Sequence, residues 1–112
     1  MLRPRFNLWV EKDGEVVISR WRARLLRAID QSGSITAAAA KMDVPYRRAW
    51  ERLHEMETSL ELKLLETEVG GSSGGGANLT PEGRALLERF EAFAEGFEEQ
   101  VEAAFNQSFH NE

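Results

Sequence analysis

The chain has 112 residues, 42% of them hydrophobic, which suffices for one domain with a modest core and is too few for two. It contains no cysteine, so disulfide bonds, thiolate metal sites and thiol catalysis are excluded. The net charge of −5 does not exclude a nucleic-acid partner, because residues 1–63 carry 12 Lys or Arg against 9 Asp or Glu, whereas residues 64–112 carry 2 against 10.

The N-terminal segment predicts a β-hairpin over residues 6–18. Apolar residues crowd both arms, and Asp13-Gly14 between them is a strong signal for a two-residue turn. We expect this hairpin to cover the core. Charged residues interrupt the apolar runs near the N-terminus, so the segment predicts neither a signal peptide nor a membrane span, and we expect a cytoplasmic protein.

A helix is expected after the hairpin, between Ser19 as its cap and Gly33 as a left-handed C-terminal cap. Apolar residues recur in it every three or four positions, which predicts one buried face. Its arginines cannot share a single face, and we expect them to be ordinary solvated charges: Arg20, Arg22, Arg24 and Arg27.

Residues 34–60 predict a helix, a short turn and a second helix. Ser34 can cap the first helix, and the alanines at 37–40 make it thin enough for a second helix to cross closely. Asp43 tolerates a turn conformation. Pro45 then suits the first position of the second helix, where a missing N–H breaks no intrahelical hydrogen bond. This is the pattern of a helix-turn-helix.

The second helix has two contrasting faces. One is an apolar stripe at Ala49, Leu53, Met56 and Leu60. The opposite face carries Tyr46, Arg47, Arg48, Glu51 and Arg52. Arginine and tyrosine in the first turn suit a recognition helix, because Arg can bind guanine edges in the major groove with two hydrogen bonds. The same residues also fit a plain solvated face, and both interpretations stay open at this point.

Residues 62–79 predict a second hairpin. Two extended segments flank the glycine-rich run from Gly70 to Gly76, and beside a helix-turn-helix such a hairpin is the wing of a winged-helix domain. A nucleotide-binding P-loop would need Lys-Ser or Lys-Thr after the glycines, and Gly76 is followed by Ala-Asn-Leu instead. A flexible linker is the remaining alternative.

Thr80 and Pro81 open a long amphipathic helix over residues 80–106, followed by a frayed tail at 107–112. One face is apolar and the other is rich in glutamate. A helix of this length reaches beyond so small a domain, so we expect its aromatic stripe to pack on a second copy of the chain. The alternative is a helix folded back across its own domain.

No constellation of catalytic or metal-binding residues is evident. His54-Glu55 lacks the second histidine of the zinc-protease pattern, and His110 lies in the tail. The glutamates of the long helix have no nucleophile or polar pocket near them in sequence. We therefore expect no enzyme activity, no metal and no cofactor.

Three motifs give the chain a family likeness. Tyr46-Arg47-Arg48-Ala49-Trp50, the wing sequence Gly-Gly-x-x-Gly-Gly-Gly-Ala and Leu-Thr-Pro-Glu-Gly-Arg at 79–84 resemble the DNA-binding domain of the ModE family of molybdate-responsive regulators, and more distantly LysR-type regulators. The resemblance implies a homodimer that reads a palindromic operator. The chain departs from the family at Pro45, where a serine cap is usual, and at Thr67 and Ser72, where the wing usually carries Arg or Lys. The family's molybdate-binding domains have no counterpart here, so we expect no molybdate binding from this chain.

The sequence thus predicts a mainly α fold with a small β component: a winged helix-turn-helix over residues 1–79 with a long dimerisation helix at 80–106. The expected function is that of a stand-alone, sequence-specific DNA-binding regulator, and the alternative is a protein interaction module that uses its acidic helix. The candidate DNA-binding residues are Ser34, Thr36, Pro45, Tyr46, Arg47, Arg48, Glu51, Arg52, Gly71, Ser72, Ser73, Gly74 and Gly75. The candidate dimer-interface residues are Phe90, Phe93, Phe97, Val101 and Ala104.

Overall fold

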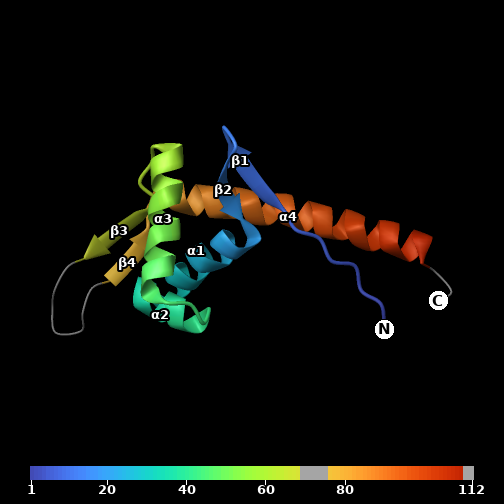
Figure 1. The fold of residues 1–112 in the computed structure, drawn as a ribbon, viewed down its shortest axis with the longest axis horizontal. Coiled ribbons are helices and arrows are strands. Elements are labelled where there is room, and N and C mark those ends of the chain that lie inside the picture. Colours follow the sequence, from blue (N-terminus) through green and yellow to red (C-terminus); the bar gives the residue numbers. More distant parts are fainter. Residues whose placement is uncertain (69–75, 110–112) are drawn as a thin grey trace.

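The structure, a computed structural model, describes residues 1–68 and 76–109, and within them four helices and two small antiparallel sheets form the predicted mixed fold. Figure 1 shows α4 running along the body of the molecule and continuing beyond it to the C-terminal end. The elements in chain order are β1 (Trp9–Lys12), β2 (Glu15–Ser19), α1 (Arg20–Ser32), α2 (Ile35–Lys41), α3 (Tyr46–Leu60), β3 (Leu65–Glu68), β4 (Gly76–Leu79) and α4 (Pro81–Ser108).

Side-chain caps begin three of the four described helices, as the sequence predicts. The hydroxyls of Ser19, Ser34 and Thr80 each accept a hydrogen bond from the backbone N–H three residues later, at 2.9 to 3.1 Å. Gly33 closes α1 with a φ of 78°, the left-handed conformation expected of a C-terminal cap. The helix boundaries are therefore set mainly by local chemistry.

The N-terminal hairpin is also confirmed, with one irregularity. Asp13 and Gly14 form its turn with φ values of 52° and 83°. The register shifts between Val10 and Glu11, so that β2 has one residue more than β1 at this point. As a result the consecutive residues Val17 and Ile18 are both buried, at 3% and 2% exposure, and β2 closes the core while β1 remains exposed.

Arg22 joins this hairpin to two helices, contrary to the expectation of a solvated charge. Its Nη1 donates to the carbonyl of Val16 at 2.9 Å, and its Nη2 lies 3.5 Å from Oε2 of Glu55 on α3. Burial lowers the pKa of the Arg22 guanidinium, and the Glu55 carboxylate opposes that shift. The sequence could not predict these two interactions, because Glu55 is distant in sequence and Val16 binds through its backbone carbonyl.

The helices α2 and α3 cross at small residues. Ala38 and Ala39 of α2 and Ala49 of α3 are between 0% and 2% exposed. In the turn that joins the helices, Asp43 has a φ of 56°, and the N–H of Val44 donates to the Ala39 carbonyl at 3.0 Å. The predicted helix-turn-helix is present with the turn conformation expected of Asp43.

Pro45 differs by one position from the prediction. With φ −62° and ψ 143° it is extended, so it is the residue that precedes α3, and the helix begins at Tyr46. The prediction that Pro45 is the first helical residue is therefore wrong. Proline still suits the position before the helix, because its fixed φ is compatible with the extended conformation as well as with the helical one.

The first turn of α4 packs directly on the backbone that leads into β3. Thr80 donates through its N–H to the Leu64 carbonyl at 3.0 Å and through its hydroxyl to the Lys63 carbonyl at 2.6 Å. A Cβ placed on Gly83 would lie 2.3 Å from the Leu64 carbonyl oxygen. Glycine is required here because no side-chain carbon fits at that distance.

Ion pairs then join α4 to α1 along their length. Arg84 Nη2 lies 2.7 Å from Oδ1 of Asp30, and Arg20 Nη2 lies 2.6 Å from Oε1 of Glu98. Between them Arg27 holds both carboxylate oxygens of Glu91, with Nε 3.1 Å from Oε2. The three α4 residues are seven positions apart, so they share one face of the helix. Arg20 and Arg27 are thus structural ion-pair partners and not the solvated charges that we expected.

The buried face of α4 is rotated from the predicted stripe. Gly83, Leu87, Phe90 and Ala94 are buried in the chain's own core. Phe90 at 4% exposure is therefore unavailable to a second copy, and its assignment to a dimer interface is corrected. The helix also extends to Ser108, two residues past the predicted end. No helix in the described ranges is long and apolar enough to cross a membrane.

The Gly83 contact yields a paired prediction. Gly83→Ala should lower the free energy of unfolding by about 1 to 3 kcal/mol, because the new methyl group displaces the Leu64 backbone. Gly96→Ala is the matched control in the same helix, where a Cβ meets nothing within 4 Å. It should raise stability by about 0.5 to 1 kcal/mol through helix propensity. Urea denaturation measures both, and equal effects of the two changes would contradict the packing argument.

The α1–α4 ion pairs predict a pH dependence. The hydrogen bond from Arg84 holds the pKa of Asp30 below its usual range, and the Arg27 charge adds to this. Because the folded pKa is the lower one, the stabilisation is complete above the unfolded pKa and is lost as pH falls through the folded value. Asp30→Asn should therefore flatten the loss of stability below about pH 4. Asp13→Asn is the control, because it removes an exposed carboxylate at the hairpin tip, outside the α1–α4 ion pairs, and an equal flattening by both variants would contradict this role of Asp30.

Candidate nucleic-acid interface

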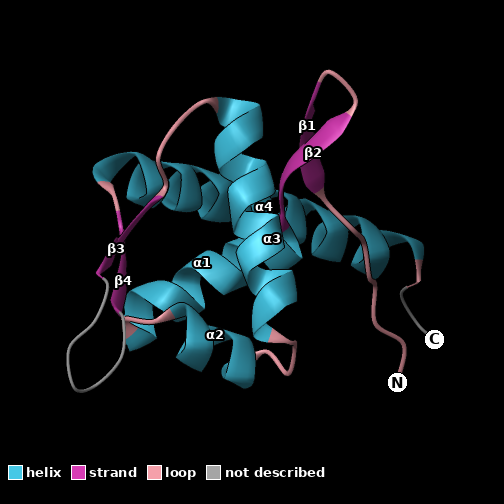
Figure 2. Cartoon of the chain, turned by 60° about the vertical axis from the view of Figure 1, so that its left-hand side comes forward, coloured by secondary structure: helices cyan, strands magenta, loops and turns pink. Residues whose placement is uncertain are grey.

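The first turn of α3 is the most exposed basic part of the helix-turn-helix. Tyr46 is 50% exposed, the Arg47 side chain is 89% exposed, and Arg48 is also exposed. Ala49 directly after them is fully buried and fixes the helix to the core. Figure 2 shows α3 between the two hairpins, with its first turn next to α2. The predicted residues are therefore accessible together at one end of the helix.

Ion pairs within α3 organise part of this face. Arg47 Nε lies 2.9 Å from Oε1 of Glu51, one turn further along, and Arg52 Nη1 lies 2.8 Å from Oε1 of Glu55. The Arg47 pair is strongly exposed, so breaking it costs little free energy. Arg47 is thus free to exchange Glu51 for another acceptor, while Arg52 is half-buried and more restrained. Glu51 holds Arg47 in an ion pair. Its own carboxylate is not suited to bind a phosphate, because both groups are negatively charged.

The start of α2 contributes two candidate residues, and they differ. The Ser34 hydroxyl is occupied by the cap on Ala37, so its role in the structure is to begin the helix. Thr36 is exposed on the first turn of α2. A hydroxyl there, together with free N–H groups at a helix start, can donate to a phosphate.

The wing hairpin is anchored at its base on both strands. The Glu57 carboxylate of α3 accepts hydrogen bonds from the N–H groups of Leu64 and Leu65, at 2.8 and 3.2 Å. On the other strand, Ala77 donates to the Gly33 carbonyl at 2.8 Å, just before α2. β3 and β4 pair antiparallel as predicted. The candidate residues Gly71, Ser72, Ser73, Gly74 and Gly75 lie outside the described residues.

Trp50 is a surface residue that the predicted site omits. It is 43% exposed on α3, and its ring stacks on His54 with centroids 3.7 Å apart and planes at 22°. His54 Nδ1 lies 3.0 Å from the Trp50 carbonyl, which fixes the imidazole against the helix. Together Tyr46 and Trp50 make an exposed aromatic edge one turn apart. The sequence signal was available, because Trp50 falls outside the apolar stripe of α3.

Metal chemistry finds no support in the described part of the chain. Residues 1–68 and 76–109 contain no group of three or more His, Cys, Asp or Glu side chains that could hold a metal ion. The imidazole of His54 stacks on the Trp50 ring and contacts the Trp50 carbonyl through Nδ1. The side chains gathered at the end of the helix-turn-helix are suited to binding through charge, hydrogen bonds and aromatic contact.

The family described as bacterial regulatory helix-turn-helix protein, lysR family, matches residues 22–84, more than half of the chain. Among curated relatives, the chain is 41% identical over 91 residues to transcriptional regulator ModE of Haemophilus influenzae. It is 38% identical over 74 residues to the DNA-binding transcriptional dual regulator ModE of Escherichia coli K12. These alignments cover 81% and 66% of the chain, but only 36% and 28% of the relatives.

A solved structure supports the fold independently. The crystal structure of BenM_DBD in complex with benA site 1 DNA superposes with a TM-score of 0.63 at 20% identity, over 81% of this chain and 97% of that one. At this identity the likeness concerns the fold alone. The arrangement of three helices, a wing and a long following helix is therefore shared with a lysR-type domain, as the sequence resemblance implied.

Proposed function

Because the chain belongs to the lysR family of bacterial regulatory helix-turn-helix proteins, we propose that it is a transcriptional regulator that reads a specific DNA sequence with the first turn of α3. The observation that carries this is the joint exposure of Tyr46, Arg47 and Arg48 at the end of the helix-turn-helix. Such a function requires access to the chromosome, so we place the protein in the cytoplasm. The proposal assigns the chain no catalytic role.

The side chains at this turn match the chemistry of a major groove. Arginine can donate two hydrogen bonds to the O6 and N7 atoms of guanine. Among the described residues, Arg47 is paired with Glu51 alone, and this pair is exposed. Thr36 at the start of α2 can bind a phosphate and fix the depth of insertion. The names of the curated relatives, transcriptional regulators and a DNA-binding dual regulator, support the same role.

The described wing contributes less in this proposal. Its exposed side chains include Glu66, Thr67 and Glu68, and two carboxylates repel a phosphate backbone. The hydrogen bonds at its base fix the wing against α2 and α3. We assign the described strands a bracing role, and the α3 turn supplies the contacts that distinguish sequences.

We further propose that the working form is a homodimer on a palindromic operator. Phe93 and Phe97 are 45% and 40% exposed and contact each other edge to face, with centroids 5.1 Å apart. Leaving two phenylalanines half in water forfeits apolar burial that a second copy restores. Val101 is half-buried and Ala104 exposed further along α4. A two-fold axis through this segment relates two α3 turns, as a palindrome requires.

DNA reading is tested by arginine replacement. After selection of a binding site from a random duplex pool, Arg47→Ala and Arg48→Ala should each weaken binding to it by about 1 to 3 kcal/mol, because each loses base contacts. Arg89→Ala removes the same charge from an exposed site on α4 and is the control. Affinities are measured by fluorescence anisotropy at fixed salt. If all three variants lose the same small amount of binding free energy, the arginines of α3 contribute only non-specific electrostatic attraction to DNA.

The proposed homodimer is tested by substitutions on α4. Phe93→Glu with Phe97→Glu should give a folded monomer in sedimentation velocity, with weaker binding to a palindromic site. The control pair, Ala92→Glu with Ala103→Glu, adds the same charge at exposed positions outside the phenylalanine stripe and should stay dimeric. A dimer of the phenylalanine variant would place the interface elsewhere, without bearing on the α3 contacts.

A further inference from the structure

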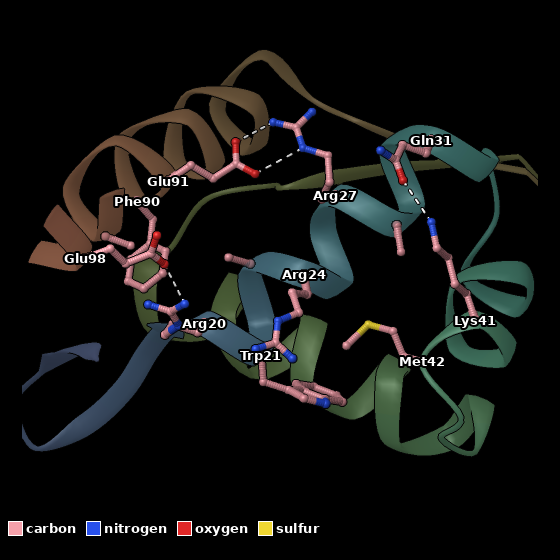
Figure 3. Close-up of a pocket in the computed structure, with 13 residues that line it drawn as sticks. Arg20, Trp21, Arg24, Arg27, Gln31, Lys41, Met42, Phe90, Glu91 and Glu98 are labelled. Atoms are coloured by element: carbon pink, nitrogen blue, oxygen red, sulfur yellow. Dashed lines mark hydrogen bonds and ion pairs between the residues drawn. The ribbon is translucent and has the colours of Figure 1, made fainter. Parts of the chain in front are cut away.

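A cavity of about 590 Å³ lies between α1, the end of α2 and α4, away from the α3 face (Figure 3). Its lining holds four basic side chains and two acidic ones, although the whole chain is acidic. This size is within the range of small-molecule sites in proteins, about 300 to 1,000 Å³. The residues that line the cavity decide which class of ligand it can bind.

The row of ion pairs between α1 and α4 is interrupted at this cavity, where one arginine of α1 has no acidic partner on α4 among the described residues. Arg20, Arg24 and Arg27 lie on successive turns of α1, and the outer two are paired with Glu98 and Glu91. Arg24 has no hydrogen bond or ion pair within residues 1–68 and 76–109. Figure 3 shows its side chain in the cavity lining, between the two ion pairs and Met42. The cavity therefore contains one arginine whose charge no carboxylate of the described chain balances.

Arg20 is fully engaged beside this cavity and is not available to a ligand. Its Nη2 binds Glu98, and its guanidinium lies 5.0 Å above the ring centroid of Phe6. Its Nη1 has no hydrogen-bond partner in the described part of the chain, but it is buried, so a ligand in the cavity does not reach it. Arg24 is therefore the arginine that a ligand can bind.

The remainder of the lining is apolar. On α4, at the level between Glu91 and Glu98, Ala94 takes the place where an acidic partner for Arg24 would lie. Phe90 and Ala94 face the cavity from α4, and Trp21 and Met42 face it from α1 and the turn after α2. A simple inorganic anion would leave this apolar surface in water. A ligand with an apolar body covers it and presents its charge to Arg24.

We propose that this cavity binds an organic carboxylate with an apolar, ring-sized body, its carboxylate held by Arg24. The site is separate from the exposed phenylalanines, because Phe93 lines a different hollow under the β1–β2 hairpin together with Val10 and Leu86. A ligand in the cavity contacts α1 and α4 together. Its binding therefore adds to the contacts that the ion pairs already make between the two helices.

The test uses 3-phenylpropionate, titrated into the full chain labelled with ¹⁵N. We expect saturable shifts at the Trp21 indole N–H and at the amides of Met42 and Ala94. The neutral isostere 3-phenylpropanamide and inorganic phosphate should each bind at least about tenfold more weakly, because one lacks the charge and the other the apolar body. Arg24→Gln should weaken the carboxylate by about tenfold or more, since a charge-assisted hydrogen bond is lost.

Arg89→Gln is the matched control, since it removes an exposed arginine from α4 outside the cavity lining and should leave the affinity unchanged. Arg24 is itself exposed and unpaired within the described ranges, so its variant should fold normally, which the spectrum itself reports. The proposal is overturned if the carboxylate does not bind, if the amide or phosphate binds as well, or if Arg24→Gln has no effect. Shifts concentrated at Phe93 and Phe97 would also overturn it. The test involves no DNA, so its failure leaves the proposed function intact.

Discussion

The close crossing of α2 and α3 is the constraint on which the rest of the structure depends. Because Ala39 and Ala49 bury only methyl groups there, the two backbones can approach closely, and the left-handed Asp43 completes the reversal between them. The first turn of α3 consequently leaves the core immediately and presents its arginines to solvent. The wing base and β2 brace the same helix from two sides, through Glu57 and through Arg22 with Glu55.

Part of the acidity of the chain acts within the molecule. Glu91 and Glu98 of α4 neutralise arginines of α1, and Asp30 of α1 binds Arg84 in return. The pKa of Asp30 is lowered and that of Arg27 is raised, mainly through these hydrogen bonds. These three arginines and three carboxylates cancel, so the net charge of −5 arises outside the α1–α4 ion pairs, in part from the exposed Glu95, Glu99 and Glu102 of α4. The α3 turn remains basic because its arginines lie beyond this network.

Local signals in the sequence predicted three of the four described helix starts and both hairpins, because a cap such as Ser34 or a turn such as Asp13-Gly14 acts within a few residues. The partners of the α1 arginines could not be predicted, since 64 residues separate Arg27 from Glu91. The α4 face was misjudged at Phe90, because an apolar residue at every third or fourth position fits two overlapping stripes. The exposed α3 turn was predictable, but the omitted Trp50 shows that an aromatic outside a buried stripe deserved equal weight.

The central claim is that the first turn of α3 contacts DNA. It is tested most directly by ¹⁵N spectra of the chain as a short duplex of arbitrary sequence is added at low salt, because non-specific binding uses the same surface. We expect the largest shifts at Thr36 and from Tyr46 to Arg48, and we expect them to fade steeply as salt rises. Shifts concentrated on α4 from Glu95 to Glu102, with α3 unchanged, would contradict it.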